Sequence, residues 1–392
     1  MRNFWHPCRR SSTTTDTSAT SPVTSHSDQR RVADGLPDFP WDVLAPYADR
    51  ARAHPGGIID MSVGTPVDPT PDVIQAALRD AANAPGYPTA AGRPELRAAA
   101  IDWMRRTLDV DAPDAGIVPA IGTKEMVAWL PTLLGLRPGS RVVIPRIAYP
   151  TYAVGALLAG CEVIATDTPE DVDDAALVWL NSPSNPTGSV MSAERMAQVV
   201  AWARERGAVV ASDECYITLG WQAQATSVLH TDVSGGRLDG LFALHSLSKR
   251  SNFAGYRYGF LAGDPRLAAD VLAVRKHAGM MVPLPVQAAA IAGLSDDEHA
   301  REQRSRYERR RAVLQTALTS HGFRIDHSEA GLYLWATRDE DAWQTVGWLA
   351  DRGILVAPGT FYGDAGTRHV RVALTATDER VEQVPERLSA QG

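Results

Sequence analysis

The sequence predicts an α/β fold in which a mostly parallel sheet is covered by helices on both faces, accompanied by a smaller α+β domain. Two observations carry this prediction. Continuous apolar runs alternate with helical spacing through the middle of the chain, which is the pattern of parallel strands buried on both faces. The last third differs, because a long basic and acidic helix at about 298–319 is followed by short strands between helices. At 392 residues, the chain can bury enough surface for two such domains.

The expected elements follow from apolar runs and from helix start signals. Apolar residues at 96, 99, 100 and 103 lie on one face of the helix that begins at residue 95. Thr70-Pro71 is a start signal for the preceding helix, 72–82. The expected strands are 58–62, 116–121, 141–145, 162–165, 176–180, 208–212, 241–244, 331–335, 353–357 and 369–374. The expected helices are a short one from residue 40, 72–82, one from residue 95, 123–134, 152–158, 193–205, 286–291 and 298–319.

Residues 1–35 are rich in serine and threonine and poor in apolar residues, so we expect a disordered extension. They lack the apolar centre of a secretion signal. Their arginine- and serine-rich character also suits an organelle transit peptide, but a dispensable extension is the interpretation we favour. The predicted domains are then 36–63, the N-terminal part of the small domain, 64–280, the large domain, and 281–392, the C-terminal part of the small domain.

Composition argues against several classes of protein. The net charge of −7 and the isoelectric point near 5.8 leave no basic surface for nucleic acid. Prolines interrupt the longest uncharged run with apolar bias, 278–295, which is also too short, so we expect no membrane span. The three cysteines are widely spaced, which suits a reducing compartment and does not contradict the cytoplasmic location that we expect. The ten histidines show no metal-ligand spacing.

One lysine is placed for chemistry at the exit of the strand 241–244. The chain has three lysines, Lys124, Lys249 and Lys276, and 36 arginines. Lys249 lies among hydroxyl residues immediately after a buried strand. A primary amine can lose its proton and form an imine, which a guanidinium cannot do. Lys249 is therefore a candidate for covalent catalysis, with a solvated lysine as the plain alternative. The side chains of Lys124 and Lys276 are expected at the surface.

Polar residues follow other predicted strands, and ligands of such sheets bind at the carboxyl ends of the strands. Gly122-Thr123-Lys124 opens a helix whose backbone N–H groups form a phosphate site. Ser246 and Arg257 can donate to the same phosphate, and Arg371 can clamp a carboxylate. Asp213 can hold a proton on a heterocyclic nitrogen, unless it is a helix cap. The stretch 181–188 is dense in turn residues.

In this order and spacing, three motifs resemble those of the class I/II aminotransferases. They are Asn185-Pro186-Thr187-Gly188, Asp213-x-x-Tyr216 and Ser246-x-Ser248-Lys249-x(7)-Arg257. The resemblance covers about residues 36–385, and the combination is specific because all three motifs fall at strand ends. It implies fold type I, with 64–280 as the domain that binds pyridoxal 5′-phosphate (PLP). It also implies a homodimer with shared active sites.

The resemblance implies a role for each matching residue. Lys249 forms an imine with PLP and then shuttles a proton between the substrate α-carbon and the cofactor. Asp213 pairs with the pyridinium N–H and keeps the ring an electron sink. The other residues implied to contact the cofactor are Gly122, Thr123, Lys124, Ser246 and Arg257 at the phosphate, Tyr149 on the ring face, Asn185 and Tyr216 at the ring hydroxyl, and Tyr87 at the phosphate of the neighbouring subunit. The residues implied to hold the substrate α-carboxylate are Gly64, Asn185 and Arg371.

Within the family, the loops 62–69, 84–88 and 248–252 look like those of actinobacterial N-succinyldiaminopimelate aminotransferases. These exchange an amino group between N-succinyl-LL-2,6-diaminopimelate and 2-oxoglutarate/glutamate on the route to diaminopimelate and lysine, and we expect this activity here. An aspartate- or aromatic-type aminotransferase and a PLP-dependent carbon–sulfur lyase stay open as alternatives. A PLP-bound DNA-binding regulator is disfavoured, because the chain is acidic and residues 1–35 are too short for a helix-turn-helix module. No motif marks the distal pocket, so side-chain specificity is not predicted.

Overall fold

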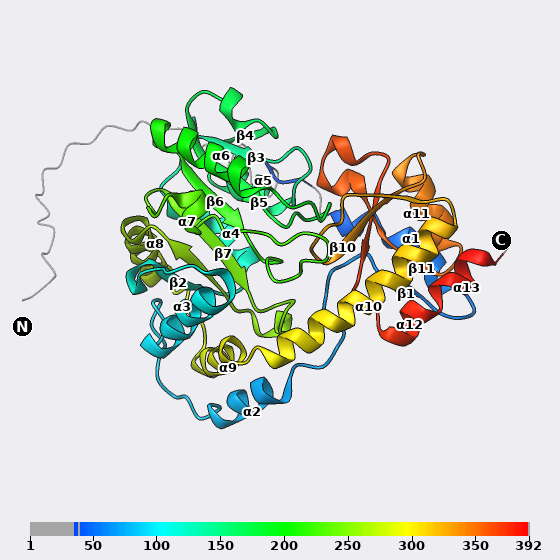
Figure 1. Cartoon of the computed structure of the whole chain (residues 1–392), viewed down its shortest axis with the longest axis horizontal. Helices are drawn as coiled ribbons and strands as arrows, with labels where there is room; N and C mark the ends of the chain where they lie inside the picture. Colours follow the sequence, from blue (N-terminus) through cyan, green and yellow to red (C-terminus); the bar gives the residue numbers. More distant parts are fainter. Residues whose placement is uncertain (1–34, 38–39, 391–392) are drawn as a thin grey trace, which may run out of the picture. The chain divides into compact units, whose positions relative to one another are not determined.

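The structure is a computed structural model that describes residues 35–37 and 40–390. The predicted disordered extension, 1–35, lies outside the described residues apart from residue 35, and so does Cys8. From Leu36 onward the chain forms one compact unit, in which the described strands build three sheets (Figure 1).

The largest sheet consists of β2 (Ile117–Ala120), β3 (Arg141–Ile144), β4 (Glu162–Ala165), β5 (Ala175–Asn181), β6 (Val209–Asp213), β7 (Leu241–Ser246) and β8 (Gly259–Gly263). Its strand order is β2-β8-β7-β6-β5-β3-β4. Neighbouring strands from β4 to β7 pair in parallel, whereas β8 is antiparallel to both β2 and β7. The mostly parallel α/β fold expected from the sequence is confirmed.

Helices cover both faces of this sheet. One apolar core joins the sheet to α2 (Asp72–Asp80), α3 (Pro94–Leu108), α6 (Ala193–Arg206), α7 (Thr231–Ser234) and α9 (Leu284–Ser295). The other joins it to α4 (Thr123–Leu133), α5 (Thr151–Leu158) and α8 (Pro265–Ala278). In β7, Leu241 and Ala243 enter the first core, and Phe242 and Leu244 enter the second. Burial on both faces explains why these strands appear in the sequence as continuous apolar runs.

The smaller sheets gather segments from both ends of the chain. The strands are β1 (Ile59–Asp60), β9 (Arg324–Asp326), β10 (Tyr333–Thr337), β11 (Ile354–Leu355), β12 (Ala357–Pro358) and β13 (Val370–Ala373). β1 pairs in parallel with β11, and the antiparallel sheet has the order β12-β13-β10-β9. A third core joins these strands, except β12, to α1 (Ala45–Arg52), α10 (Glu298–Ser320), α11 (Ala342–Ala350), α12 (Asp378–Glu382) and α13 (Val384–Ser389).

The structure differs from the sequence prediction at β8, at α8 and at 353–357, and the first and last of these differences have a physical cause. β8 carries only three apolar residues between two glycines, too short a run to identify as a strand. α8, which follows it, has no element predicted in its place. The strand expected at 353–357 is two strands, β11 and β12, because the chain changes its pairing partner at Val356 from β1 to β13.

α9 bears on the domain boundaries, which stay a prediction. We expected 281–392 to belong to the small domain. α9, however, contributes Ala289, Ala290 and Leu294 to the core that it shares with α2 and α3. α10 packs instead against α12 and α13 (Figure 1). A boundary in the turn between α9 and α10 fits this packing better than one at 280.

Among the described residues, no helix is both long and apolar enough to cross a membrane. In this part of the chain, no group of three or more His, Cys, Asp or Glu side chains is placed to hold a metal ion.

Gly155 sets the distance between α4 and α5. A Cβ at this position would lie 2.8 Å from the backbone oxygens of both Val127 and Ala128. Because backbone in a packed helix pair cannot move aside cheaply, we predict that Gly155→Ala lowers the free energy of unfolding by about 1–3 kcal/mol. Urea unfolding measures this change.

The matched control is Gly347→Ala in α11, whose new Cβ would meet nothing closer than 3.5 Å. This variant should keep its stability or gain up to about 1 kcal/mol from the higher helix propensity of alanine. Equal losses in the two variants would show that the separation of α4 and α5 is not the cause.

Candidate active site

The carboxyl ends of the parallel strands border a cavity of about 820 Å³. Its charged lining residues are four cations and one carboxylate: Lys124, Lys249, Arg257, Arg371 and Asp213. Such an excess of positive charge suits a ligand pair with a phosphate and a carboxylate. Of the residues that the sequence points to, all but Gly122 and Tyr87 line this cavity.

Lys249 lies in the turn that follows β7, and its Nζ donates a hydrogen bond to the backbone oxygen of Gly64. Burial is the main cause that lowers the pKa of the amine to about 8; the guanidinium groups of Arg371 and Arg257 also lower it, and the thiol of Cys215 opposes the shift. The neutral form of the amine is the one that attacks a carbonyl group or accepts a proton. Lys249 is therefore suited to both tasks near neutral pH.

Asp213 ends β6 and is buried in the same cavity. Its Oδ2 accepts a hydrogen bond from the hydroxyl of Tyr152 at 2.9 Å, and its Oδ1 accepts one from the N–H of Cys215 at 3.2 Å. Burial raises the pKa of this carboxyl group, although both hydrogen bonds oppose the rise. A cationic N–H placed against Asp213 would offset the cost of burying its charge.

Gly122 and Arg257 meet at the start of α4. Gly122 has a φ of +78°, and a Cβ there would lie 2.4 Å from Nη2 of Arg257. Glycine therefore lets the guanidinium lie against the first turn of α4, where backbone N–H groups have no helical partner. Thr123 opens this helix, and Ser246 at the end of β7 accepts a hydrogen bond from the N–H of Ser248 at 3.0 Å.

Arg371 of β13 provides the second anion site. Its side chain is buried, donating from Nη1 to Oδ1 of Asn185 at 3.0 Å and from Nη2 to the backbone oxygen of Ser62 at 2.6 Å. Its guanidinium carbon lies 4.1 Å from the ring centroid of Tyr333. Among the described residues, Nε of Arg371 is buried without a hydrogen-bond partner. A buried guanidinium with a donor to spare is ready to bind a carboxylate.

Gly64 leaves little room for a side chain at this end of the cavity. A Cβ on Gly64 would lie 2.2 Å from the hydroxyl of Tyr333. The same hydroxyl is 3.0 Å from the hydroxyl of Tyr216. Glycine at this position therefore lets the loop after β1 approach Tyr333, and it places the backbone oxygen of Gly64 within reach of Lys249.

The remaining predicted residues differ in their surroundings. Burial raises the pKa of Tyr149 to about 12, which keeps its hydroxyl neutral where it lines the cavity. Lys124, whose side chain we expected at the surface, is exposed and also lines the cavity. Tyr87 is 100% exposed on the segment between α2 and α3, so its expected contact with a neighbouring subunit stays a prediction.

Two residues that line the cavity, Tyr333 and Cys215, and the partner of Asp213, Tyr152, were not assigned to the site from the sequence. Tyr152, the partner of Asp213, lies one helical turn after Tyr149, and that spacing at a helix start was the available signal. Tyr333 lies in a strand without a motif. Cys215 is half-buried and lines the cavity, with its Sγ 3.2 Å from Oγ1 of Thr123. Burial raises the pKa of this thiol well above its usual value, which makes Cys215 a poor nucleophile.

The residues present fit PLP. The glycine cradle at Gly122, with Arg257 against it, suits the phosphate, and the buried carboxylate of Asp213 suits a protonated ring nitrogen. Lys249 supplies a primary amine in the same cavity. Tyr149 and Tyr216 place aromatic and hydroxyl groups along the cavity, and the hydroxyl of Tyr152 donates to Asp213.

Comparisons with known proteins agree with this site. The family model "Aminotransferase class I and II" matches residues 57–388. The chain is 55% identical over 356 residues to the 4-dedimethylamino-4-oxo-anhydrotetracycline transaminase OxyQ of Streptomyces rimosus, covering 90% of this chain and 99% of OxyQ. It is 56% identical over 361 residues to the probable aminotransferase Rv1178 of Mycobacterium tuberculosis, covering 91% and 86% of the two chains.

Among solved structures, a probable N-succinyldiaminopimelate aminotransferase from Thermus thermophilus superposes with a TM-score of 0.81 at 26% identity. The superposition covers 89% of this chain and 99% of the Thermus chain. The family match spans most of the chain, and two relatives are more than half identical to it. This chain therefore belongs to the class I and II aminotransferases, which use pyridoxal 5′-phosphate.

Proposed function

We propose that this chain transfers an amino group between N-succinyl-LL-2,6-diaminopimelate and 2-oxoglutarate/glutamate, a step of diaminopimelate and lysine biosynthesis. The buried Arg371 lines the same cavity as Lys249, and this observation supports the use of α-amino acids as substrates. A guanidinium binds a carboxylate through two parallel hydrogen bonds. It thereby fixes the α-carbon of the substrate relative to the amine of Lys249, which is the positioning that proton transfer requires.

Bound PLP would supply an electron sink for the charge that develops when the substrate α-carbon loses its proton. We assign the proton transfer to Lys249, whose Nζ would take the proton from the α-carbon in its neutral form and return it later in the turnover. Asp213 would hold the proton on the ring nitrogen. The hydroxyl of Tyr152 and the N–H of Cys215 orient that carboxylate from two sides.

Asn185 would link the substrate and cofactor ends of the site. Its Oδ1 accepts from Arg371, which orients the guanidinium toward the cavity, and its amide is then available to the ring hydroxyl. Gly122, Thr123, Ser246 and Arg257 would hold the phosphate through N–H, hydroxyl and guanidinium donors. Tyr149 would pack on the ring face.

Two observations support the substrate pair. The loop 62–69, one of those that resemble N-succinyldiaminopimelate aminotransferases, contributes Val63 and Gly64 to the cavity. The superposed Thermus structure also bears the name of that activity. The broader alternatives, an aspartate- or aromatic-type aminotransferase and a carbon–sulfur lyase, would use the same Lys249 and Asp213.

A second candidate function is amination of a ketone on a fused-ring compound. OxyQ, which is named for such a substrate, is 55% identical to this chain over nearly its whole length. The cavity also has an apolar wall formed by Trp41, Val127, Ala128 and Val154. Apolar side chains of this kind can pack against fused rings.

We also propose that the enzyme works as a cytoplasmic homodimer. Tyr87 is fully exposed, and the family resemblance implies that active sites are shared between subunits. The exposure of Tyr87 supports this arrangement, because a large tyrosine left in water is a candidate for an interface.

A panel of donors distinguishes the candidate functions. We predict that the PLP-loaded protein makes glutamate from 2-oxoglutarate with N-succinyl-LL-2,6-diaminopimelate as donor, at a higher kcat/KM than with aspartate or phenylalanine. Lys249→Ala should abolish the activity. Turnover of only another amino acid would refute the proposed substrate, and pyruvate with ammonia from cystathionine would identify a lyase. Amination of a fused-ring ketone with glutamate as donor would select the second candidate.

The role of Arg371 is tested by Arg371→Leu. Loss of two hydrogen bonds to a charged group, at about 1.5–3 kcal/mol each, should lower kcat/KM for α-amino acids by about 10²–10⁴-fold. The exposed Arg368→Leu, three residues earlier, should leave the kinetics near those of the unaltered enzyme. An amine that lacks the α-carboxylate should react equally with both variants. Equal losses for carboxylated and decarboxylated amines would show that Arg371 does not bind the carboxylate.

The lowered pKa of Lys249 predicts the pH dependence of its reactivity in the cofactor-free protein. Because the amine titrates at about 8 rather than 10.5, its neutral fraction should rise from pH 6 and level off above pH 9. Reductive methylation with formaldehyde at several pH values, followed by peptide mass spectrometry, measures this profile. Labelling of the exposed Lys276 in the same sample corrects for the pH dependence of the reagent itself. A Lys249 profile that still climbs steeply above pH 10 would contradict the prediction.

A further inference from the structure

The turn that carries Lys249 is fastened to α10. The backbone oxygen of Lys249 accepts a hydrogen bond from the hydroxyl of Tyr307 at 3.2 Å. Three residues later, Nδ2 of Asn252 donates to Oε1 of Gln303 at 2.9 Å. Both bonds are made by one face of α10, since Gln303 and Tyr307 are four residues apart. The helix therefore holds the Lys249 turn at its two ends.

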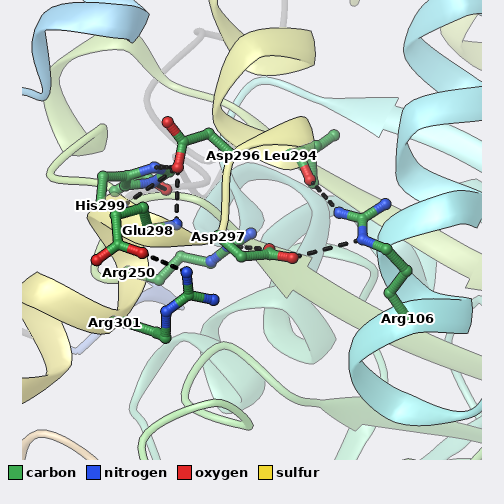
Figure 2. A network of polar contacts seen from close by, with 9 residues as sticks. Arg106, Arg250, Leu294, Asp296, Asp297, Glu298, His299 and Arg301 are labelled. Atoms are coloured by element: carbon green, nitrogen blue, oxygen red, sulfur yellow. Dashed lines mark hydrogen bonds and ion pairs between the residues drawn. The ribbon is translucent and has the colours of Figure 1, made fainter.

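The two residues between these ends contact the start of the same helix. Figure 2 shows Arg250 and Arg106 on either side of Asp297, in the turn between α9 and α10, at 3.3 and 3.4 Å from its carboxylate oxygens. Oγ of Ser251 lies 2.8 Å from Nε2 of His299. Burial lowers the pKa of Arg250 to about 10 although Asp297 is close. Each residue from Lys249 to Asn252 thus contacts α10 or the turn before it.

Gln303 connects this turn to a second loop. Its Nε2 donates to Oδ2 of Asp68 at 2.8 Å, in the loop between β1 and α2. Burial raises the pKa of Asp68, but hydrogen bonds from Arg310 and Gln303 outweigh it and the net shift is downward. Arg310 reaches both carboxylate oxygens of Asp68 at 2.9 and 2.6 Å. Asp68 is therefore an anion held to α10 by the helix's own donors.

The two loops also contact each other directly. Oγ1 of Thr70 donates to the backbone oxygen of Asn252 at 3.0 Å, and Nδ2 of Asn252 donates to the backbone oxygen of Pro69 at 3.1 Å. At the far end of the same loop, Gly64 accepts from the amine of Lys249. The amine and Gly64 thus close a ring of contacts that runs through Asn252, Gln303 and the 64–70 loop.

We propose that Gln303 is a positioning residue for the amine of Lys249. Gln303 accepts from Asn252 and donates to Asp68, so one buried amide joins the two loops to each other and to α10, in addition to their direct hydrogen bonds. The separation of the two loops sets where the amine stands relative to the bound substrate α-carbon. The inference rests on the proposed role of Lys249 as the proton-transfer group. It extends that role to α10, whose later residues pack in the core of the small sheets.

Gln303→Leu tests the proposal, because it keeps most of the volume and removes both hydrogen bonds. Misplacement of a reacting group by about 1 Å costs on the order of 10²-fold in rate. We therefore expect kcat to fall by roughly 10- to 100-fold with KM changed much less. Gln303→Glu keeps the acceptor for Asn252 but repels Asp68, so it should lie between the unaltered enzyme and Gln303→Leu. The matched control is Gln315→Leu, at a half-buried position later on α10, which should leave kcat unchanged.

A second set of measurements uses the protein without PLP. In the cofactor-free protein, Gln303→Leu should shift the pH profile of Lys249 methylation upward and speed hydrogen–deuterium exchange in 249–252. A purely structural Gln303 would instead lower the melting temperature and leave the profile and kcat in place, which would overturn the proposal. If Gln303→Leu fails to fold, Asn252→Gly replaces it, since glycine suits the φ of +48° at this position and removes the partner amide.

These readouts also separate failure of the inference from failure of the proposed function. If the unaltered enzyme does not transaminate the proposed donor, the methylation profiles still report whether Gln303 positions the amine. If the unaltered enzyme does transaminate it and Gln303→Leu matches it in kcat and in profile, only the inference about Gln303 is wrong.

Discussion

The amine of Lys249 shares its cavity with three other cationic side chains and a single carboxylate. An ammonium ion in such a place is disfavoured twice, by loss of water and by repulsion from Arg371 and Arg257, and its pKa falls to about 8. The same arrangement prepares the cavity for a phosphate and a carboxylate, because those anions relieve the repulsion among the cations. Charge excess thus serves binding and reactivity together: the groups that hold the two anions also help keep the amine neutral.

The parallel register of three strands turns this electrostatic arrangement into a defined geometry. Asn181 of β5 lies opposite Asp213 of β6, and Asp213 lies opposite Leu244 of β7, two residues before that strand ends. Asn181 donates to the backbone oxygen of Asp213 at 2.9 Å and accepts from the N–H of Asn185 at 2.7 Å. Asn185 in turn accepts from Arg371. A continuous set of hydrogen bonds therefore connects Asp213, proposed to hold the ring nitrogen, with Arg371, proposed to bind the substrate carboxylate.

Much of this could be predicted from the sequence, because strands buried on both faces leave continuous apolar runs and ligands gather where such strands end. That reasoning led to Lys249, Asp213, Arg257 and Arg371. It could not lead to Tyr333 or Gln303, since each acts through a contact between segments far apart in the chain. β8 could not be predicted from the sequence either, because its three apolar residues form a strand only by pairing with β2 and β7 on both sides.

Like the residues that the sequence could not predict, the residues that choose the substrate come from segments far apart in the chain. The groups that act on the α-carbon come from strand ends, where motifs are local, whereas the apolar wall combines Trp41 with Val127 and Ala128 of α4 and Val154 of α5. None of these four belongs to a motif that is proposed to bind the cofactor, so we expect that each can change while the chemistry at Lys249 is kept. Aminotransferases that share most of their sequence can therefore keep one reaction and differ in the far end of the substrate. We therefore expect the choice between a diaminopimelate derivative and a fused-ring ketone to depend on this wall rather than on any residue that handles the proton.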